Sequence, residues 1–303
     1  MKKVYFSIRE DITDVSPNKS SDHKFVQRMN EICDLHLVHP CEYDLDSMSV
    51  KASYHYNSPT ELIEASGRHT PEGDLFIIFS DGSNRNRGLD FAKKEYEFLK
   101  ILKDEGYVNK FFNEPETEEK TMKSGLVELC KDTKLKIANT LDFSVENAES
   151  MIKEYGSAVA KPIFGCQMAG VMLLKDAGEI REDDIEYLNQ NYVLQEPLSG
   201  DEKRVVVMDG SVLMSRVHKN RPNPWNDTSN TRTEIYEPSP LEREIAIMNT
   251  NAIGAYLAGI DFIGDKINEI NGSGTGIYFK DENTGNTIDK TGELVEYVKR
   301  FLE

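Results

Sequence analysis

Short runs of consecutive hydrophobic residues, separated by polar stretches, mark the first third of the chain. The runs Val4–Ile8, Leu35–Val38 and Leu75–Phe79 have the length and continuity of strands that are covered on both faces of a sheet. Across residues 88–106 the apolar positions recur at helical intervals, which predicts a helix connecting two strands. Strands alternating with helices predict an α/β lobe with parallel strands. Residues 41–70 are mostly polar, and we expect them to be irregular.

A polar, proline-containing segment, Asn113–Glu119, interrupts this pattern and predicts the end of the first lobe. The elements that we predict after it are a helix Thr117–Cys130, a strand Lys136–Thr140, a helix Ser144–Tyr155, a strand ending at Pro162, and strands Val171–Leu174 and Tyr192–Gln195. They form a small α+β lobe. We therefore divide the chain into three lobes, residues 1–112, 113–199 and 200–303.

The last lobe begins with a predicted β-hairpin. Its strands are Arg204–Met208 and Leu213–Val217, and they flank Asp209-Gly210, a dipeptide suited to a tight two-residue turn. Further along, the pattern predicts a helix Leu241–Leu257 and two short strands, Ile260–Ile263 and Lys266–Ile270.

Composition excludes several classes of protein. A chain of 303 residues can bury a sufficient core without disulfides or a structural metal. Its 53 acidic residues against 36 basic ones give a net charge of −17, which opposes the broad basic surface that nucleic-acid binding requires. No apolar run approaches the roughly 18 residues of a membrane span, and no cleavable apolar segment opens the sequence. We therefore expect no nucleic-acid or membrane partner and a cytoplasmic location.

The four cysteines and six histidines carry no recognisable motif. The cysteines show no CxxC spacing, so we interpret them as reduced thiols. The histidines lack the spacing of a metal site or of a nucleophile's partner, which leaves a serine or cysteine hydrolase without support.

The sharpest local feature is a set of three oxygen-bearing side chains. Glu269 and Asn271 are two residues apart on a predicted strand and therefore face the same way, and Asp261 lies on the partner strand. Such a set fits a magnesium site that keeps open positions for phosphate oxygens. In a chain with 53 acidic residues it also arises by chance, so spacing alone leaves both interpretations open.

Two further features have the chemistry of anion binding. Lys161 ends a predicted strand and precedes a loop with Gly165 and Gly170, which can fold over phosphates. Arg204 and Arg216 lie on the hairpin strands, where they either converge on one phosphate or carboxylate or remain solvated surface charges. The chain has neither a GxxxxGK[ST] nor a GxGxxG sequence, which disfavours a dinucleotide site.

Several of these segments occur in a specific order along the chain. They are Lys123, Ala160-Lys161-Pro162, the short glycine loop, Val193–Leu198, Asp201–Gly210, Arg216 and Gly259–Asn271. In this order and at these intervals they resemble the ATP-grasp superfamily, and most closely the bacterial glutathione synthetases. The resemblance covers nearly the whole chain. It implies an α/β protein with the ATP-grasp fold and an N-terminal Rossmann-like (pre-ATP-grasp) lobe.

The resemblance also implies cofactors and site residues. The cofactors are ATP and Mg²⁺, with two ions. The implied nucleotide-binding residues are Lys123, Lys161, Gly165, Gln195, Glu196, Leu198 and Lys203, with Lys120 an alternative to Lys123. The implied metal ligands are Asp261, Glu269 and Asn271. The implied catalytic residues, which would hold the γ-phosphate and the donor carboxylate, are Arg204, Arg216 and Asn230.

The implied activity is that of an ATP-dependent carboxylate–amine ligase, which forms an amide through an acyl phosphate and releases ADP and phosphate. Its substrates would be small carboxylates and amines, such as amino acids or short peptides, and its assembly a homodimer or homotetramer. The glycine loop is bulkier than in the family, and Asn230–Glu234 replaces an Ala-Gly-rich stretch, so the product stays open. The alternatives are a phosphotransferase acting on a small hydroxyl substrate and a nucleotide-binding module without turnover.

Overall fold

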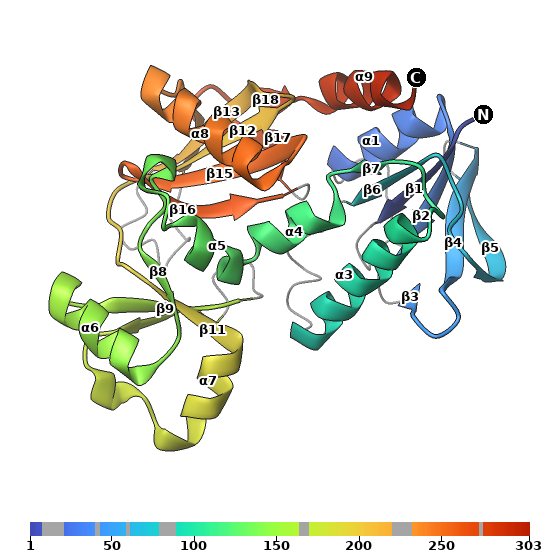
Figure 1. The fold of residues 1–303 in the computed structure, drawn as a ribbon. Coiled ribbons are helices and arrows are strands. Elements are labelled where there is room, and N and C mark those ends of the chain that lie inside the picture. The colour runs from blue at the N-terminus through green and yellow to red at the C-terminus, as the bar shows by residue number, and fades with distance from the viewer. Residues whose placement is uncertain are drawn as a thin grey trace.

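The computed structural model describes residues 1–7, 21–39, 43–58, 61–78, 89–163, 170–219, 232–272 and 275–303. Three β-sheets of four or more strands follow one another in chain order in this part of the chain, each accompanied by helices (Figure 1). The first and third sheets contribute to one hydrophobic core, which positions the candidate site described below.

The first sheet has parallel strands at its centre, as the hydrophobic runs predict. Its central elements are β1 (Lys3–Ser7), α1 (Ser21–Asn30), β2 (Asp34–Val38), β6 (Leu75–Ile78), α3 (Leu89–Asp104) and β7 (Phe111–Phe112). β1 pairs in parallel with β2 and β6, and β6 pairs in parallel with β7. Val4 and Phe6 enter the core on one face, whereas Tyr5 enters a second core on the other. The prediction of a sheet covered on both faces is confirmed.

The prediction that residues 41–70 are irregular is wrong. They form β3 (Tyr43–Asp44), β4 (Ser49–Ser58) and β5 (Glu61–His69), which extend the sheet by antiparallel pairing. The β4–β5 register shifts twice, between Val50 and Ala52 and between Tyr56 and Ser58. The alternation of Val50, Ala52, Tyr54 and Tyr56 with polar residues is a strand pattern, which the high polar content of the segment conceals.

The predicted helix Thr117–Cys130 is two helices rather than one. α4 (Pro115–Thr121) and α5 (Lys123–Leu129) are separated by Met122, which has an extended backbone. A Cβ atom at Gly125 would lie 2.4 Å from the carbonyl oxygen of Lys120, so only glycine allows the two helices to approach this closely. The break makes Lys123 the first residue of a new helix.

The second sheet is antiparallel and has the strand order β10-β9-β11-β8. Its elements are β8 (Thr140–Asp142), α6 (Val145–Tyr155), β9 (Ala158–Pro162), β10 (Met172–Leu174), α7 (Ile185–Asn191) and β11 (Tyr192–Gln195). Ser144 caps α6 by accepting a hydrogen bond from the backbone N–H of Asn147, as its position predicts. The predicted strand Lys136–Thr140 is misplaced, because Lys136 has a left-handed backbone and β8 begins only at Thr140.

The third sheet carries most of the candidate site. Its strands, in spatial order, are β14 (Arg232–Ile235), β13 (Ser211–Lys219), β12 (Glu202–Met208), β15 (Leu257–Ile263) and β16 (Lys266–Asn271). The hairpin turn at Asp209 and Gly210 is confirmed, and both residues have positive φ. α8 (Pro240–Ile253) ends four residues earlier than predicted, with Gly254 as its C-cap, because Leu257 already begins β15.

The last helix returns to the first sheet. After β17 (Tyr278–Lys280) and β18 (Thr287–Asp289), helix α9 (Thr291–Leu302) lies beside α1 (Figure 1). Leu294 and Val298 share a core with Val4 of β1 and with Val206 of β12. The lobes that the sequence separates are therefore packed together, and their boundaries at residues 112 and 199 stay predictions.

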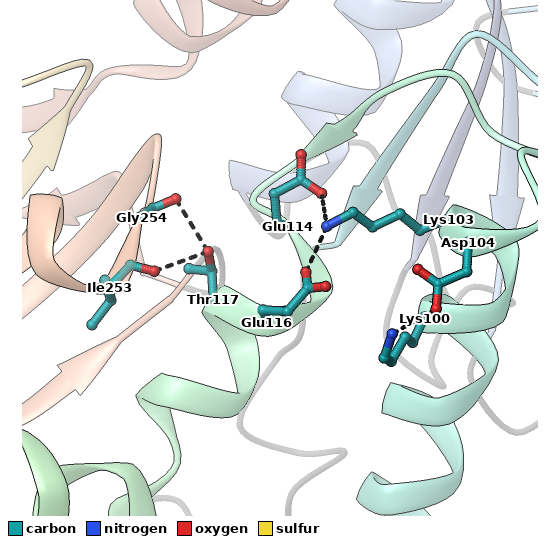
Figure 2. A network of polar contacts seen from close by, with 8 residues as sticks. All are labelled: Lys100, Lys103, Asp104, Glu114, Glu116, Thr117, Ile253 and Gly254. Carbon is teal, nitrogen blue, oxygen red and sulfur yellow. Dashed lines mark hydrogen bonds and ion pairs between the residues drawn. The ribbon is translucent and has the colours of Figure 1, made fainter.

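A polar network also joins α3, α4 and α8. Lys103 contacts the carboxylates of Glu114 and Glu116 at 3.1 and 2.8 Å, and the Thr117 hydroxyl contacts the carbonyl oxygens of Ile253 and Gly254 at 3.2 and 3.1 Å (Figure 2). Helix α4 is thus hydrogen-bonded to the C-terminal end of α8, the helix that covers the third sheet.

Candidate active site

The register of four neighbouring strands gathers charged side chains on one face of the third sheet. Arg204 on β12 lies opposite Arg216 on β13 and opposite Asp261 on β15, and Asp261 lies opposite Glu269 on β16. Directly opposed residues of an antiparallel sheet point to the same face. The other face of β12 packs against α8, through Val205 and hydrophobic residues around it. The charged face is therefore the one that α8 leaves uncovered.

Asp261 lies at the centre of this face and is held by two side chains. The guanidinium of Arg204 donates from Nε and Nη2 to its two carboxylate oxygens, at 2.6 Å each. Asn271 donates from Nδ2 to Asp261 Oδ2 at 2.9 Å. Burial disfavours the charged guanidinium, but this two-pronged ion pair outweighs burial and raises the pKa of Arg204. The structure thus brings Arg204, Asp261 and Asn271 together.

Glu269 connects this face to α5. Lys123 Nζ lies 3.3 Å from Glu269 Oε1, and both side chains are mostly buried. Lys123 reaches Glu269 because α5 begins at this residue, after the break at Met122. Lys120, the alternative on α4, is exposed.

Lys161 is a buried cation between the second and third sheets. Its ammonium group donates to the side-chain oxygens of Gln195 and of Asn268, the latter at 2.7 Å. Burial lowers its pKa to about 7, although the nearby negative charge of Glu269 opposes the shift. Both hydrogen-bond acceptors are neutral amides, so they orient the ammonium without a charge of their own.

The sequence analysis missed Asn268. Asp261 pairs with Glu269 while Phe262 pairs with Ile267, so Asn268 is the extra residue of a β-bulge. A strict two-residue alternation would place Asn268 on the face opposite to Glu269. The register shift cannot be recognised from the sequence of β16 alone.

The end of β11 forms the junction of the second and third sheets. Gln195 donates to the backbone carbonyl oxygen of Asn268 at 3.2 Å, and Glu196 accepts from Lys266 Nζ at 2.5 Å and from the backbone N–H of Asn139 at 2.9 Å. Leu198 packs against a small core formed by residues of both sheets. The junction that contains Lys161 therefore also contains Gln195, Glu196 and Leu198.

Lys203 lies on the α8 side of the third sheet, apart from Arg204. Its ammonium group donates to Glu242 Oε1 at 2.8 Å and lies 5.5 Å from the centre of the Tyr236 ring. The structure does not bring Lys203 together with the charged face. Asn230 and Gly165 lie outside the residues that the structure describes, and so does most of the glycine loop.

Arg216 is the cation of the charged face whose hydrogen-bond donors are least completely paired. Its guanidinium lies 5.8 Å from the centre of the Phe279 ring, and its buried Nε has no hydrogen-bond partner among the described residues. Burial and the neighbouring charge of Arg204 lower the pKa of Arg216 to about 10. A buried donor without a partner is costly, so this position is suited to receive an anionic ligand.

The donor set at Asp261, Glu269 and Asn271 suits a hard divalent cation. All three side chains carry oxygen, the ligand atom that Mg²⁺ prefers, and the strand register places the two carboxylates opposite each other. The described residues contain no group of three or more His, Cys, Asp or Glu side chains that could hold a metal ion. The two carboxylates and the Asn271 amide would therefore hold magnesium together with phosphate oxygens of a nucleotide.

Comparison with known proteins identifies the family. The sequence profile of the prokaryotic glutathione synthetase ATP-grasp domain matches residues 133–284. The chain belongs to this family. Residues 133–284 include the whole of β8–β16, and so most of the site described above, whereas Lys123 precedes the matched region.

Curated relatives of the family are distant in sequence. Tetrahydromethanopterin:alpha-L-glutamate ligase of Methanocaldococcus jannaschii is 28% identical over 173 residues, which are 52% of this chain and 59% of the relative. Glutathione synthetase of Mesorhizobium japonicum is 32% identical over 132 residues, 39% of this chain and 42% of the relative. The chain spans about half the length of the curated relatives it matches.

Solved structures of the ATP-grasp fold cover the chain almost completely. The ATP-grasp ligase PsnB in complex with a minimal precursor superposes with a TM-score of 0.65 at 17% identity, covering 100% of this chain and 99% of that one. The D-cycloserine synthetase DcsG gives 0.64 at 11% identity, covering 99% and 100%. These likenesses establish the ATP-grasp fold, α/β in class, and confirm the fold implied by the sequence resemblance. No helix in the described part of the chain has the length and apolar character of a membrane span.

Proposed function

We propose that this member of the family is an ATP-dependent carboxylate–amine ligase that forms an amide or peptide bond and releases ADP and phosphate. The observation that carries the proposal is the charged face, where Arg204 and the incompletely paired Arg216 lie beside three oxygen-bearing side chains. A carboxylate becomes an acyl donor only after its oxygen is made a good leaving group, and phosphorylation achieves this. Two guanidinium groups stabilise the negative charge that both reaction partners bring.

The residues of the chain have separate tasks in this proposal. Lys161 and Lys123 would contact the nucleotide phosphates, and Gln195, Glu196 and Leu198 would contact the base and ribose. Arg204 and Arg216 would orient the donor carboxylate toward the γ-phosphate and hold the resulting acyl phosphate for attack by the amine. We still predict that Lys203 and Gly165 contact the nucleotide and that Asn230 contacts the γ-phosphate and the donor carboxylate.

Magnesium would be held by Asp261, Glu269 and Asn271. When bound, it supplies positive charge that neutralises phosphate oxygens. The relative PsnB has been solved with Mg and ADP, which supports the same requirement here, and we propose two ions.

The substrates are proposed as a small carboxylate and a small amine, of the amino-acid or short-peptide class. The proteins to which this chain is similar include a glutamate ligase, glutathione synthetases, a D-alanyl-alanine synthetase and ligases solved with precursor peptides, which supports the amino-acid or peptide class. A homodimer or homotetramer and a cytoplasmic location stay predictions.

Product analysis tests the proposal. The protein is incubated with Mg-ATP, a panel of amino acids and dipeptides, and hydroxylamine as a general acceptor. We expect ADP, phosphate and an acyl hydroxamate in stoichiometric amounts. AMP as the nucleotide product would contradict an acyl phosphate, and a phosphorylated hydroxyl compound would show the alternative phosphotransferase.

We expect Glu269→Gln to lower magnesium-dependent ATP turnover by about 100-fold, because it removes a charged ligand and the partner of Lys123 while preserving side-chain shape. ADP release is measured, and circular dichroism checks that the fold is retained. The control is Glu244→Gln on the exposed face of α8, which should leave turnover unchanged. Wild-type turnover in Glu269→Gln would remove the metal assignment.

A further inference from the structure

His218 shares the charged face with the two arginines but has no role in the proposal above. It follows Arg216 by two residues on β13, and the register between them is regular, so both side chains point to the same face. It lies opposite Glu202 on β12 and Thr233 on β14, toward the edge of the sheet. Of the histidines whose side chains the structure describes, His36, His39 and His69 belong to the first lobe, and His218 lies on this face.

The imidazole is held in a defined orientation. His218 Nδ1 lies 3.0 Å from Thr233 Oγ1. Thr233 is fixed in turn by Glu282, which accepts from its backbone N–H at 3.1 Å and whose own N–H donates to its carbonyl oxygen at 2.9 Å. In the tautomer in which Nδ1–H donates to the threonine hydroxyl, Nε2 presents a lone pair on the side away from β14.

We propose that His218 accepts the ammonium proton of the incoming amine, so that the free amine can attack the acyl phosphate. This inference rests on the proposed ligase activity and adds a catalytic residue to it. The amine nitrogen forms a bond to the carbonyl carbon, and the bond from that carbon to the phosphate oxygen breaks, so phosphate leaves with the electron pair. Before this attack the ammonium proton passes to Nε2 of His218 and then to solvent, and the second proton, which nitrogen loses as the amide forms, leaves with the phosphate.

The charges around His218 make its basicity depend on whether the substrate is bound. Burial and the charges of Arg216 and Arg204 lower its pKa to about 4, while Asp261 and Glu282 act in the opposite direction. The imidazole is therefore neutral but only weakly basic until the substrate binds. An anionic acyl phosphate bound by the two arginines offsets their charge and makes the imidazole more basic at the stage where the amine attacks.

The experiment separates formation of the acyl phosphate from its capture by an amine. Wild type, His218→Gln and the control His69→Gln, a histidine of the first sheet, are supplied with Mg-ATP and a carboxylate that supports ADP release. Hydroxylamine, which is largely unprotonated at neutral pH, is one acceptor, and glycine and L-glutamate, which are protonated amines, are the others.

We expect His218→Gln to form the hydroxamate within about two-fold of wild type and to form the amide about 100-fold more slowly at pH 7, the range of general-base catalysis. The deficit should shrink as pH rises and free amine accumulates. His69→Gln should match wild type with both acceptors. Equal losses with hydroxylamine and with the amines, or no loss with either, would overturn the inference.

Failure of the ligase proposal itself is distinguishable, because wild type would then release no ADP with any carboxylate in the presence of hydroxylamine. A second readout does not depend on knowing the substrates. The imidazole signal of His218 is followed by NMR as a function of pH, with and without Mg-AMPPNP. An upward shift of its pKa with the nucleotide supports the coupling to the arginines, and an unchanged pKa contradicts it.

Discussion

Lys161 is a single residue at which burial opposes the positive charge that the proposed function requires. Its ammonium group is almost completely buried, yet its two hydrogen-bond acceptors, Gln195 and Asn268, are neutral. Burial keeps its pKa near 7 rather than near that of a free lysine, although the charge of Glu269 opposes this shift. A bound phosphate would add negative charge beside this nitrogen and would favour its charged form.

We therefore expect Lys161→Met to weaken the binding of Mg-AMPPNP by about 10- to 100-fold, the value of a lost hydrogen bond to a charged group. Calorimetry measures the affinity. Lys153→Met, at an exposed position of α6, is the matched control and should bind like wild type. Wild-type affinity in Lys161→Met would exclude the lysine from the nucleotide site.

The sequence predicts the strands that carry the side chains of the charged face, and alternation predicts that Glu269 and Asn271 face the same way. It does not predict their convergence, because register shifts after Val206 and Asp261 bring Arg204 opposite Arg216 and Asp261 opposite Glu269. Asn268 could not be predicted either, since the second shift moves it to the face of its neighbour. His218 carries no recognisable motif, and the sequence does not reveal that β14 pairs with β13 and supplies Thr233.

Among the elements, α8 depends on its N-terminal cap for its attachment to the sheet. Ser239 and Glu242 form a reciprocal capping box, and Glu242 also accepts hydrogen bonds from Lys203 and Tyr236. Burial alone would raise the pKa of Glu242, but these hydrogen bonds lower it to about 2. The folded pKa is thus below the usual value near 4.5, so the ionised carboxylate stabilises the fold above about pH 4.5.

This contribution is lost as pH falls from about 4.5 toward 2. We expect Glu242→Gln to lower the free energy of unfolding by about 2 kcal/mol at pH 6. Near pH 2 the difference between wild type and variant should vanish. Urea denaturation at several pH values measures both effects, with Glu244→Gln as control. A difference that is independent of pH would show that the charge of Glu242 does not stabilise the helix.

Most helices and strands could be predicted from periodicity, and the exceptions have local physical causes. The break between α4 and α5 depends on a contact of the Gly125 backbone with Lys120, which no propensity encodes. β4 follows a two-residue alternation from Val50 to Tyr56, but the high polar content of residues 41–70 favours an irregular interpretation.

For the whole molecule, the important contact is the return of the last helix to the first sheet. Leu294 and Val298 of α9 share one core with Val4 of β1 and Val206 of β12. Chain order alone gives no indication of this packing, because each lobe has a complete sheet of its own. The network around Thr117 and Lys103 adds a second connection between the same parts (Figure 2).

We expect Leu294→Ala to destabilise the first and third sheets together, by about 3 kcal/mol, because it leaves a cavity in their common core. Hydrogen exchange should then show faster opening of both β1 and β12. Leu241→Ala, at an exposed position of α8, should leave exchange unchanged. Faster exchange in β1 alone would show that the two sheets unfold independently.

The bidentate ion pair between Arg204 and Asp261 belongs to a charge balance that affects the order in which magnesium and the nucleotide bind. Four cationic side chains, Arg204, Arg216, Lys123 and Lys161, stand against two carboxylates, Asp261 and Glu269. A lone divalent ion would meet an electrostatic surplus of its own sign, whereas a triphosphate carrying its ion would arrive as a net polyanion. We therefore expect the protein to bind the magnesium–nucleotide complex in preference to the bare ion.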